Sequence, residues 1–339
     1  MRFLMVVFAL GAAAHAATLT VGTASAPAGQ RANGFLQVPA GVDAAASVPV
    51  IVINGAKAGP TLALVAGAHG TEYASIIALE KIAQQANPAE MSGALIVLPL
   101  VNTASFAQKV PHLNPVDGKN MNRFYPGKAD GTQTERISWA ISQEVIAKAG
   151  YLLDFHGGDL DENMRQYAYW AQTGKSELDE TSRRMVLAFG LDHIIMQDFR
   201  VPGASVTITR YAAGLGKPSV AVEAGHAGTV LAEDVDALVD GTFSVMRHLK
   251  MMPGEPRPVA KPLWFPRYSS VTSEADGIFY PLAAPEAYVT KGMVIGYVTD
   301  AFGKRVWEAV APSNGVILYI GAVPSMKKGD TVANIGEVQ

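Results

Sequence analysis

The sequence predicts an α/β fold, with a mixed and largely parallel sheet that carries helices on both faces and is followed by a small all-β region. Two observations support this prediction. Apolar segments of strand length alternate with segments of helical periodicity up to about residue 250, which is typical of a parallel sheet. Beyond residue 262, short alternating segments are separated by glycine and proline, which is typical of β structure.

The first sixteen residues match a secretory signal peptide. Arg2 precedes an apolar stretch from Phe3 to about Ala14, and Ala14-His15-Ala16 fits a small-x-small cleavage site. The stretch is shorter than the roughly 20 apolar residues of a membrane-spanning helix. We therefore expect residues 1–16 to be removed, giving an exported protein, periplasmic or secreted, without a membrane span. A first core strand or a membrane anchor are the alternatives.

Periodicity places the elements of the main region, residues 17–251. Strands are predicted at 34–39, 48–55, 61–68, 93–102, 151–158 and 219–225. Helices are predicted at 71–85, 134–150, 179–190, 205–218 and 231–251. The proline-rich residues 252–261 are predicted to be a linker, and residues 262–339 a small β domain.

Composition excludes several functional classes. Lys and Arg number 27 against 30 Asp and Glu, so a net charge of −3 offers no general attraction for nucleic acid. The chain has no cysteine, which excludes disulfides and thiol nucleophiles. Any metal site must therefore use His, Asp or Glu.

Polar residues follow the apolar strands where ligands bind in α/β folds. His69 and Glu72 follow one strand, His156 ends another, and Glu223 ends a third. Two histidines and one carboxylate, with water as the fourth ligand, form the ligand set of a catalytic zinc site, although iron and manganese accept similar ligands. Each motif alone also fits a helix cap or a satisfied polar group, and the combination favours a metal site.

Two further features suit a hydrolase. Glu223 has the chemistry of a general base beside a metal-bound water, with a capping or salt-bridged Glu as the alternative. Asn122 and Arg123 lie in a loop among turn residues. An arginine beside an asparagine suits a substrate carboxylate, although a solvated charge is the simpler interpretation.

The motifs resemble those of a known family. His69-Gly70-Thr71-Glu72, Asn122-Arg123-Phe124, Asp154-Phe155-His156 and Val222-Glu223-Ala224-Gly225 occur in the order seen in the succinylglutamate desuccinylase/aspartoacylase family, part of the wider zinc carboxypeptidase group. The resemblance covers about residues 45–250. The tail also resembles the biotinyl/lipoyl-like β domain of these deacylases, but it lacks a lysine in the usual attachment turn, so no such group is expected.

The resemblance implies a zinc-carboxypeptidase-like fold and one zinc ion per chain. It assigns the zinc ligands to His69, Glu72 and His156, the general base to Glu223, and binding of the substrate carboxylate to Asn122 and Arg123. The implied reaction is hydrolysis of the amide bond of a small N-acyl amino acid or related acylated amine, with metal-bound water as the nucleophile. An exported metallocarboxypeptidase acting on peptides or cell-wall fragments is the alternative, and a non-enzymatic binding protein is a third.

The sequence departs from the family pattern in places. Related enzymes have an arginine about ten residues before the Asn-Arg pair, where this chain offers His112 or Lys109. Asn120 stands where an aspartate often supports the first histidine ligand. Arg200, Arg210 and His226 are further candidates to reach the site, and the oligomeric state is open.

Overall fold

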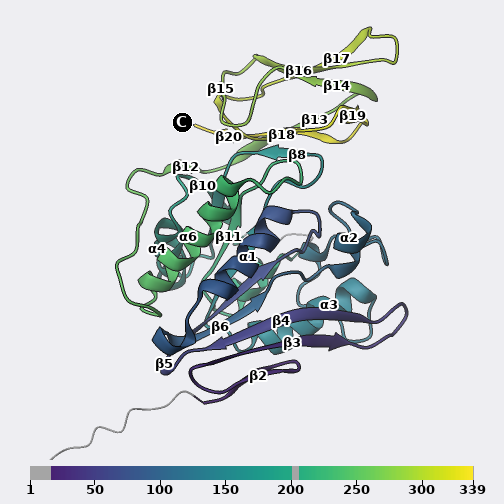
Figure 1. Ribbon diagram of the computed structural model, residues 1–339. Helices are drawn as coiled ribbons and strands as arrows, with labels where there is room; N and C mark the ends of the chain where they lie inside the picture. Colours follow the sequence, from purple (N-terminus) through teal and green to yellow (C-terminus); the bar gives the residue numbers. More distant parts are fainter. Residues whose placement is uncertain (1–16, 201–205, 339) are drawn as a thin grey trace, which may run out of the picture.

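A nine-stranded sheet forms the centre of the computed structural model, which describes residues 17–200 and 206–338 (Figure 1). The strand order is β12-β10-β9-β11-β7-β5-β6-β4-β3. The bounds are β3 (Gln30–Val38), β4 (Ala46–Asn54), β5 (Lys57–Ala66), β6 (Ser92–Leu98), β7 (Tyr151–His156), β9 (Tyr167–Gln172), β10 (His193–Asp198), β11 (Ser219–Glu223) and β12 (Leu263–Phe265). Parallel pairs run through the centre, and antiparallel pairs join β9 to β11 and add β4 and β3. The predicted mixed, largely parallel sheet is confirmed. The expected signal peptide, residues 1–16, lies outside the described residues.

Helices cover both faces of this sheet. The helices packed in one apolar cluster are α1 (Tyr73–Gln85), α4 (Ser176–Phe189) and α6 (Ala232–His248). The other cluster contains α3 (Gln133–Ile141), α5 (Ile208–Gly214) and the hairpin of β1 (Leu19–Val21) and β2 (Ala24–Ala26). Along β5, Leu62 and Leu64 enter the first cluster and Ala63 and Val65 the second. This alternation explains why buried parallel strands are apolar throughout.

Two of the predicted helices are clearly shorter in the structure, whereas α4 begins three residues earlier than predicted. The segment predicted at 134–150 leaves α-helical geometry after Ile141 and continues as a π-helical turn, Ser142–Ile146. The segment predicted at 205–218 is helical from Ile208 to Gly214. Short elements also occur at α2 (Thr103–Gln108) and in two 3₁₀ turns, Pro88–Glu90 and Met121–Arg123.

The sequence prediction missed β9 and β10. In β9, Tyr167 and Tyr169 pack in an apolar cluster and also present hydroxyl groups to the cavity, which weakens the apolar signal of the strand. β10 ends in two polar residues, Gln197 and Asp198, which likewise weaken the apolar pattern of this strand.

The C-terminal region consists of two antiparallel sheets around its own apolar cluster. One sheet contains β13 (Tyr268–Thr272), β20 (Thr331–Glu337), β18 (Gly315–Gly321) and β15 (Tyr288–Val289). The other contains β17 (Arg305–Val310), β16 (Val294–Thr299), β14 (Gly277–Pro281) and β19 (Ser325–Met326). Figure 1 shows this region stacked beyond one end of the large sheet.

The two regions exchange strands. β12 follows the proline-rich segment and pairs in parallel with β10 at the edge of the large sheet. In return, β8 (Glu162–Met164) leaves the main region and pairs with β18. A small apolar cluster that includes Ile195, Phe265 and Leu318 lies where the regions meet. The division at residues 252–261 stays a prediction, and each region contributes one strand to the other.

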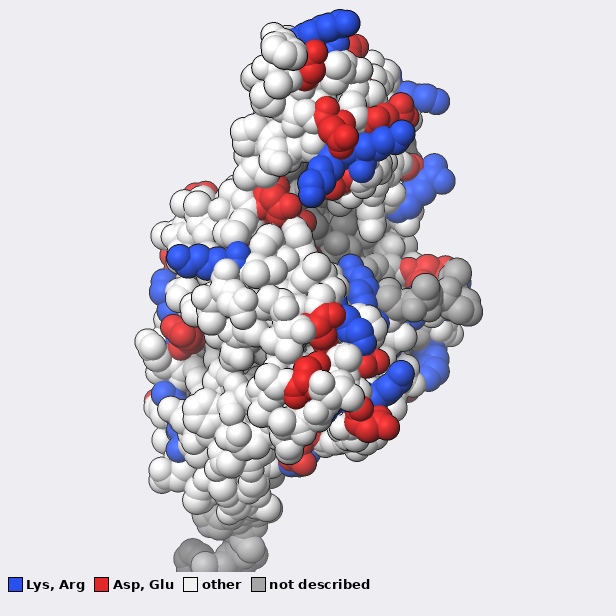
Figure 2. All heavy atoms as spheres, turned by 90° about the vertical axis from the view of Figure 1, so that its right-hand side faces the viewer, with Lys and Arg blue, Asp and Glu red and all other residues white. Residues whose placement is uncertain are grey.

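The surface shows no long single-sign area on the face drawn in Figure 2, where Lys and Arg are interspersed with Asp and Glu. None of the helices within residues 17–200 and 206–338 is both long and apolar enough to cross a membrane.

Candidate metal centre and catalytic cavity

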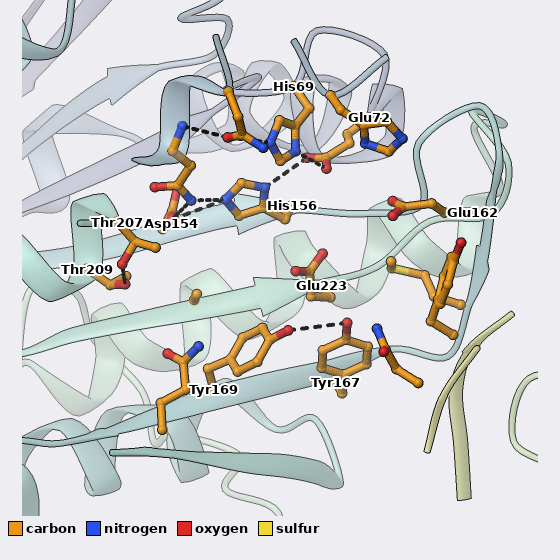
Figure 3. Close-up of a pocket in the computed structure, with 18 of the residues that line it drawn as sticks. His69, Glu72, Asp154, His156, Glu162, Tyr167, Tyr169, Thr207, Thr209 and Glu223 are labelled. Carbon is orange, nitrogen blue, oxygen red and sulfur yellow. Dashed lines mark hydrogen bonds and ion pairs between the residues drawn. The ribbon is translucent and has the colours of Figure 1, made fainter. Parts of the chain in front are cut away.

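A cavity of about 440 Å³ lies at the carboxyl ends of the central strands (Figure 3). The structure brings together there all the residues that the sequence singled out for zinc binding, catalysis and substrate binding: His69, Glu72, Asn122, Arg123, His156 and Glu223. They come from segments more than 150 positions apart along the chain. The predicted convergence of strand ends therefore occurs.

A tight turn between β5 and α1 positions His69 and Glu72. Glu72 is the N-cap residue of α1, so its side chain leaves the helix end beside the turn. Gly70, between the two, packs against α2, and a Cβ atom there would lie 2.2 Å from the backbone nitrogen of Phe106. A side chain at position 70 would push the turn away from α2, so the His-Gly-Thr-Glu spacing has a steric cause.

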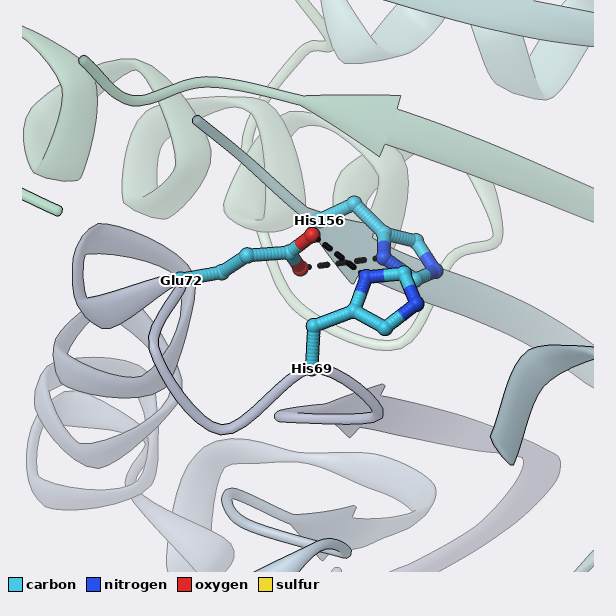
Figure 4. A group of neighbouring side chains, drawn as sticks. All are labelled: His69, Glu72 and His156. Atoms are coloured by element: carbon cyan, nitrogen blue, oxygen red, sulfur yellow. Dashed lines mark hydrogen bonds and ion pairs between the residues drawn. The ribbon is translucent and has the colours of Figure 1, made fainter. Parts of the chain in front are cut away.

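The carboxylate of Glu72 lies between two imidazole rings (Figure 4). Its Oε1 is 2.6 Å from Nδ1 of His69, and its Oε2 is 3.0 Å from Nδ1 of His156. One ligand atom of each residue lies within 4.8 Å of the others. The side chains of Glu72 and His156 are only 3% and 5% exposed. Three metal-ligating groups are thus gathered in a largely buried site.

The far ring nitrogens have their own partners. Nε2 of His69 is 3.2 Å from Oδ1 of Asn120, and Nε2 of His156 is 3.1 Å from Oδ2 of Asp154. These oxygens accept hydrogen bonds, so we assign the imidazole protons to Nε2. Both Nδ1 lone pairs then face the carboxylate of Glu72. With both rings neutral, three acceptors converge without a donor between them, which fits a bound cation.

The electrostatics of the three groups are mutually dependent. Burial alone would raise the pKa of Glu72, but His69 and His156 outweigh it and lower the pKa to about 2. Burial alone would lower the pKa of His156, but Asp154 and Glu72 raise it well above its ordinary value. The site therefore favours one positive charge beside the Glu72 carboxylate.

Glu223 lies in register with the metal ligand on the next strand. In the sheet, β11 pairs Glu223 with His156 of β7 on one side and with Tyr167 of β9 on the other. Neighbouring strands lie about 4.8 Å apart, so the three side chains form a row across the cavity floor. Burial raises the pKa of Glu223 well above its ordinary value; His156 opposes this shift, and Glu72 adds to it.

Asn122 and Arg123 have different environments. Asn122 is buried: its Oδ1 accepts the Ile208 N–H at 2.9 Å, and its Nδ2 lies 3.2 Å from Asp154 and 2.8 Å from Nε2 of His156. The Asn122 amide and the Asp154 carboxylate therefore both lie beside Nε2 of His156. Arg123 is exposed, and its Nη1 donates to the Asn122 carbonyl at 2.8 Å. Asn122 is thus committed to the protein, and Arg123 keeps donors for a ligand.

Comparison with known proteins places this arrangement in a family. Residues 58–249 match the model of the succinylglutamate desuccinylase/aspartoacylase catalytic domain. The chain belongs to the succinylglutamate desuccinylase/aspartoacylase family. Members of this family are hydrolases that act as deacylases, as the sequence predicted.

Full-length relatives agree with this membership. The chain is 30% identical over 316 residues to an N-alpha-acetyl-L-2,4-diaminobutyric acid deacetylase from Halomonas elongata, an alignment that covers 90% of this chain and 91% of the relative. A succinylglutamate desuccinylase structure from Silicibacter sp. TM1040 has a TM-score of 0.83 at 25% identity, covering 92% of this chain and 97% of that one. The product-bound ectoine utilization protein of Ruegeria pomeroyi has a TM-score of 0.82 at 26% identity, covering 91% and 95%.

His112, which the sequence offered in place of a carbonyl-polarising arginine, is engaged by neighbouring carboxylates. His112 lines the cavity, but its Nε2 lies 2.8 Å from Asp161 and its Nδ1 3.3 Å from Asp159. Burial alone would lower the pKa of His112, yet these carboxylates and Glu162 raise it to about 9. His112 is therefore an imidazolium whose N–H groups already face carboxylates.

The other basic candidates do not reach this cavity. Within the described chain, Lys109, Arg200, Arg210 and His226 are absent from its lining. Arg200 pairs with Asp198 at the surface, and His226 pairs with Asp234.

Sequence reasoning missed most of the outer wall of this cavity. That wall, which we define by Glu162, Tyr268, Tyr319 and Asn334, comes from β8 and from three strands of the C-terminal region. No local pattern connects these positions, because they meet only through long-range pairing. Tyr167 and Tyr169 were detectable in principle, since their two-residue spacing places both side chains on one face of a strand. Thr207 and Thr209 complete the opposite end (Figure 3).

Proposed function

We propose that the protein is a zinc-dependent deacylase that hydrolyses the amide bond of a small N-acyl amino acid. The observation that carries the proposal is the buried His69, Glu72 and His156 cluster with Glu223 in register beside it. Family membership supports the reaction class, and the relative from Halomonas elongata, named as a deacetylase of an acetylated diamino acid, supports the type of substrate.

The donor set suits zinc. Two imidazole nitrogens and one carboxylate would hold the ion, and the cavity leaves the remaining side open to a ligand. Zinc, when bound, acts as a Lewis acid that polarises a carbonyl group and acidifies water. Asn120 and Asp154 hold the two rings in the orientation that binding requires.

Glu223 moves the proton in this proposal. Its carboxylate accepts a proton from the attacking water and returns it to the leaving nitrogen, so that the amine departs as a neutral group. A positive charge bound beside it favours the ionised carboxylate that this role requires. Arg123 orients the substrate by forked hydrogen bonds to its carboxylate.

The size of the cavity favours a small substrate over a peptide. Tyr268, Tyr319 and Asn334 of the C-terminal region line the cavity together with the metal ligands. A long peptide would have to displace this wall. A metallocarboxypeptidase would act on peptides, and this cavity is too closed to hold a long peptide.

One assay tests the proposal directly. Metal-free protein is reloaded with zinc, and hydrolysis is measured for a panel of acetylated amino acids, their methyl esters and short peptides. We expect zinc-dependent turnover of the free acids, and weak turnover of the esters because Arg123 loses its anionic partner. Arg123→Lys should lose about as much as Arg123→Ala, since an ammonium group makes no forked pair. Preference for peptides or esters would contradict the proposal.

We also propose that the protein is exported. The support is the signal-like sequence of residues 1–16. Intact-mass analysis of the protein from the extracytoplasmic fraction of a bacterial host tests this, and we expect the chain to begin at Ala17. Protein that keeps Met1 in that fraction would contradict the proposal.

A further inference from the structure

Glu162 is a carboxylate in the catalytic cavity to which the reaction assigns no role. It lies at the start of β8, where it pairs with Gly321 of β18, so both regions of the molecule position it. Figure 3 shows its carboxylate directed into the same space as Glu72 and Glu223. Glu162 is thus available to a ligand that occupies the cavity.

The carboxylate of Glu162 lacks a cationic partner. Its Oε2 accepts one hydrogen bond, from the Asp159 N–H at 3.2 Å, and it forms no salt bridge with any residue in the described parts of the chain. His112 lines the same cavity and attracts the Glu162 carboxylate, but Asp159 and Asp161 already flank its ring. A partly buried carboxylate without an ion pair is costly, and burial raises the pKa of Glu162 to about 7, with His112 opposing the shift and Glu72 adding to it.

The approach to Glu162 is also acidic. A neighbouring hollow of about 300 Å³ shares Glu162, His112 and Tyr319 with the catalytic cavity. Its other charged lining residues are Asp161 and Asp330. Three carboxylates and one imidazolium favour a cation over an anion along this side.

The two ends of the cavity differ in the charged groups that they offer to a ligand, since the Asp154 carboxylate near Thr207 is already bonded to Asn122 and His156. In Figure 3, Thr207 and Thr209 lie at one end and Glu162 at the other. The segment that carries Arg123 is joined to the Thr207 end, because the Val206 N–H donates to the Arg123 carbonyl at 3.1 Å. A substrate with an anionic group at one end and a cationic group at the other matches this polarity.

We propose that Glu162 binds a protonated amine on the side chain of the substrate, so that the enzyme prefers N-acyl diamino acids whose second amine is free. This inference rests on the proposed deacylase function and names its substrate class. Glu162 is a specificity residue, and it takes no part in the transfer of protons at the scissile bond.

A matched pair of substrates tests the assignment. N-α-acetyl-L-2,4-diaminobutyrate and N-α-acetyl-L-norvaline have the same side-chain length, with an ammonium group in one and a methyl group in the other. At about pH 8 the carboxylate is ionised and the amine is protonated. We expect kcat/KM of the zinc-loaded enzyme to favour the diamino substrate by about tenfold or more, the usual worth of a hydrogen bond between charged groups.

Variants separate recognition from structure. Glu162→Gln keeps the shape and the acceptor for the Asp159 N–H, so it should lose the preference while its turnover of acetyl-norvaline stays near the wild-type value. Glu274→Gln makes the same change at an exposed position that lines neither the catalytic cavity nor the neighbouring hollow, and it should keep the preference. An equal loss on both substrates in Glu162→Gln, or an unchanged preference, would overturn the inference.

A binding measurement keeps the test independent of turnover. Calorimetric titration of the zinc-loaded protein with L-2,4-diaminobutyrate and with L-norvaline should show tighter binding of the diamino compound, and Glu162→Gln should remove the difference. If acetyl-norvaline is hydrolysed but neither method shows a preference that depends on Glu162, this inference alone fails. If no acyl amino acid is hydrolysed by the zinc-loaded protein, the proposed function fails, and the titration still decides the role of Glu162.

Discussion

The two sides of the catalytic cavity are built in different ways. On the metal side, His69, Glu72 and His156 are held by short contacts to one another and to Asn120 and Asp154. On the outer wall, Glu162 accepts a single hydrogen bond, and Tyr268 is 45% exposed. The metal side is fixed before any ligand arrives, whereas the wall keeps polar groups for the ligand. We infer that the first sets the reaction and the second sets its substrate.

Removal of a metal ligand should have the largest effect. His156→Ala leaves two protein ligands, so the variant should lose its zinc and about three orders of magnitude or more of its turnover, because Lewis-acid chemistry is worth several kcal/mol. Elemental analysis and kcat on one preparation measure both quantities. A variant that keeps a full equivalent of zinc would show that the ligand set is wrong.

Removal of the proposed base should have the next largest effect. Glu223→Gln keeps the size of the side chain and should keep zinc and substrate binding, while kcat falls by roughly a hundredfold or more. The loss should appear in kcat more than in KM, because proton transfer belongs to the transition state. Normal turnover by a folded, zinc-loaded variant would show that Glu223 is only structural.

Changes on the outer wall should be milder and of a different kind. Tyr268→Ala removes a half-exposed side chain that lines the cavity, so KM should rise by about threefold to tenfold while kcat and zinc content stay near the wild-type values. Steady-state kinetics on an acetylated amino acid measure this. A fall in kcat without a change in KM would remove the distinction between the two sides.

The smallest expected effect is on stability, through an ion pair that lies next to a loop of the metal side. Glu135 caps α3 and pairs with Lys119 at 3.0 Å, next to the loop that carries Asn120 and Arg123. Hydrogen bonds from Lys119 and Thr132 lower the pKa of Glu135 to about 2. The folded state therefore binds a proton at Glu135 less readily than the unfolded state does. The ionised carboxylate stabilises the fold fully above about pH 4.5, and this stabilisation is lost as the pH falls toward 2.

Glu135→Gln should therefore lower the free energy of unfolding by about 1 kcal/mol at pH 7, a value reduced by solvent screening of the ion pair. The difference in the free energy of unfolding between Glu135→Gln and wild type should become smaller as the pH falls below 4.5. Urea unfolding of both proteins between pH 7 and pH 3 measures it, and a constant difference would show that the charge of Glu135 has no part in the effect.

The same contrast explains what the sequence could predict. His69, Glu72, His156 and Glu223 follow apolar strands, so a local pattern placed them at one edge of a sheet. Asn122 was predicted beside Arg123 as a substrate ligand, but no pattern showed that Asp154 and Ile208 occupy its amide. Glu162 and Tyr319 meet only because β8 crosses to β18, a pairing between segments about 155 positions apart. Register over such a separation depends on the whole fold.

The exchange of β8 and β12 limits how this molecule can be divided. A cut at the proline-rich segment would remove β12 and expose the edge of β10, which invites aggregation through unpaired backbone groups. The remaining half would also lose the partner of β8, and with it the placement of Glu162. The C-terminal region therefore cannot be exchanged as an independent domain. New specificities in this scaffold should arise by point substitutions within the wall, because a transplanted region would have to reproduce both strand pairings at once.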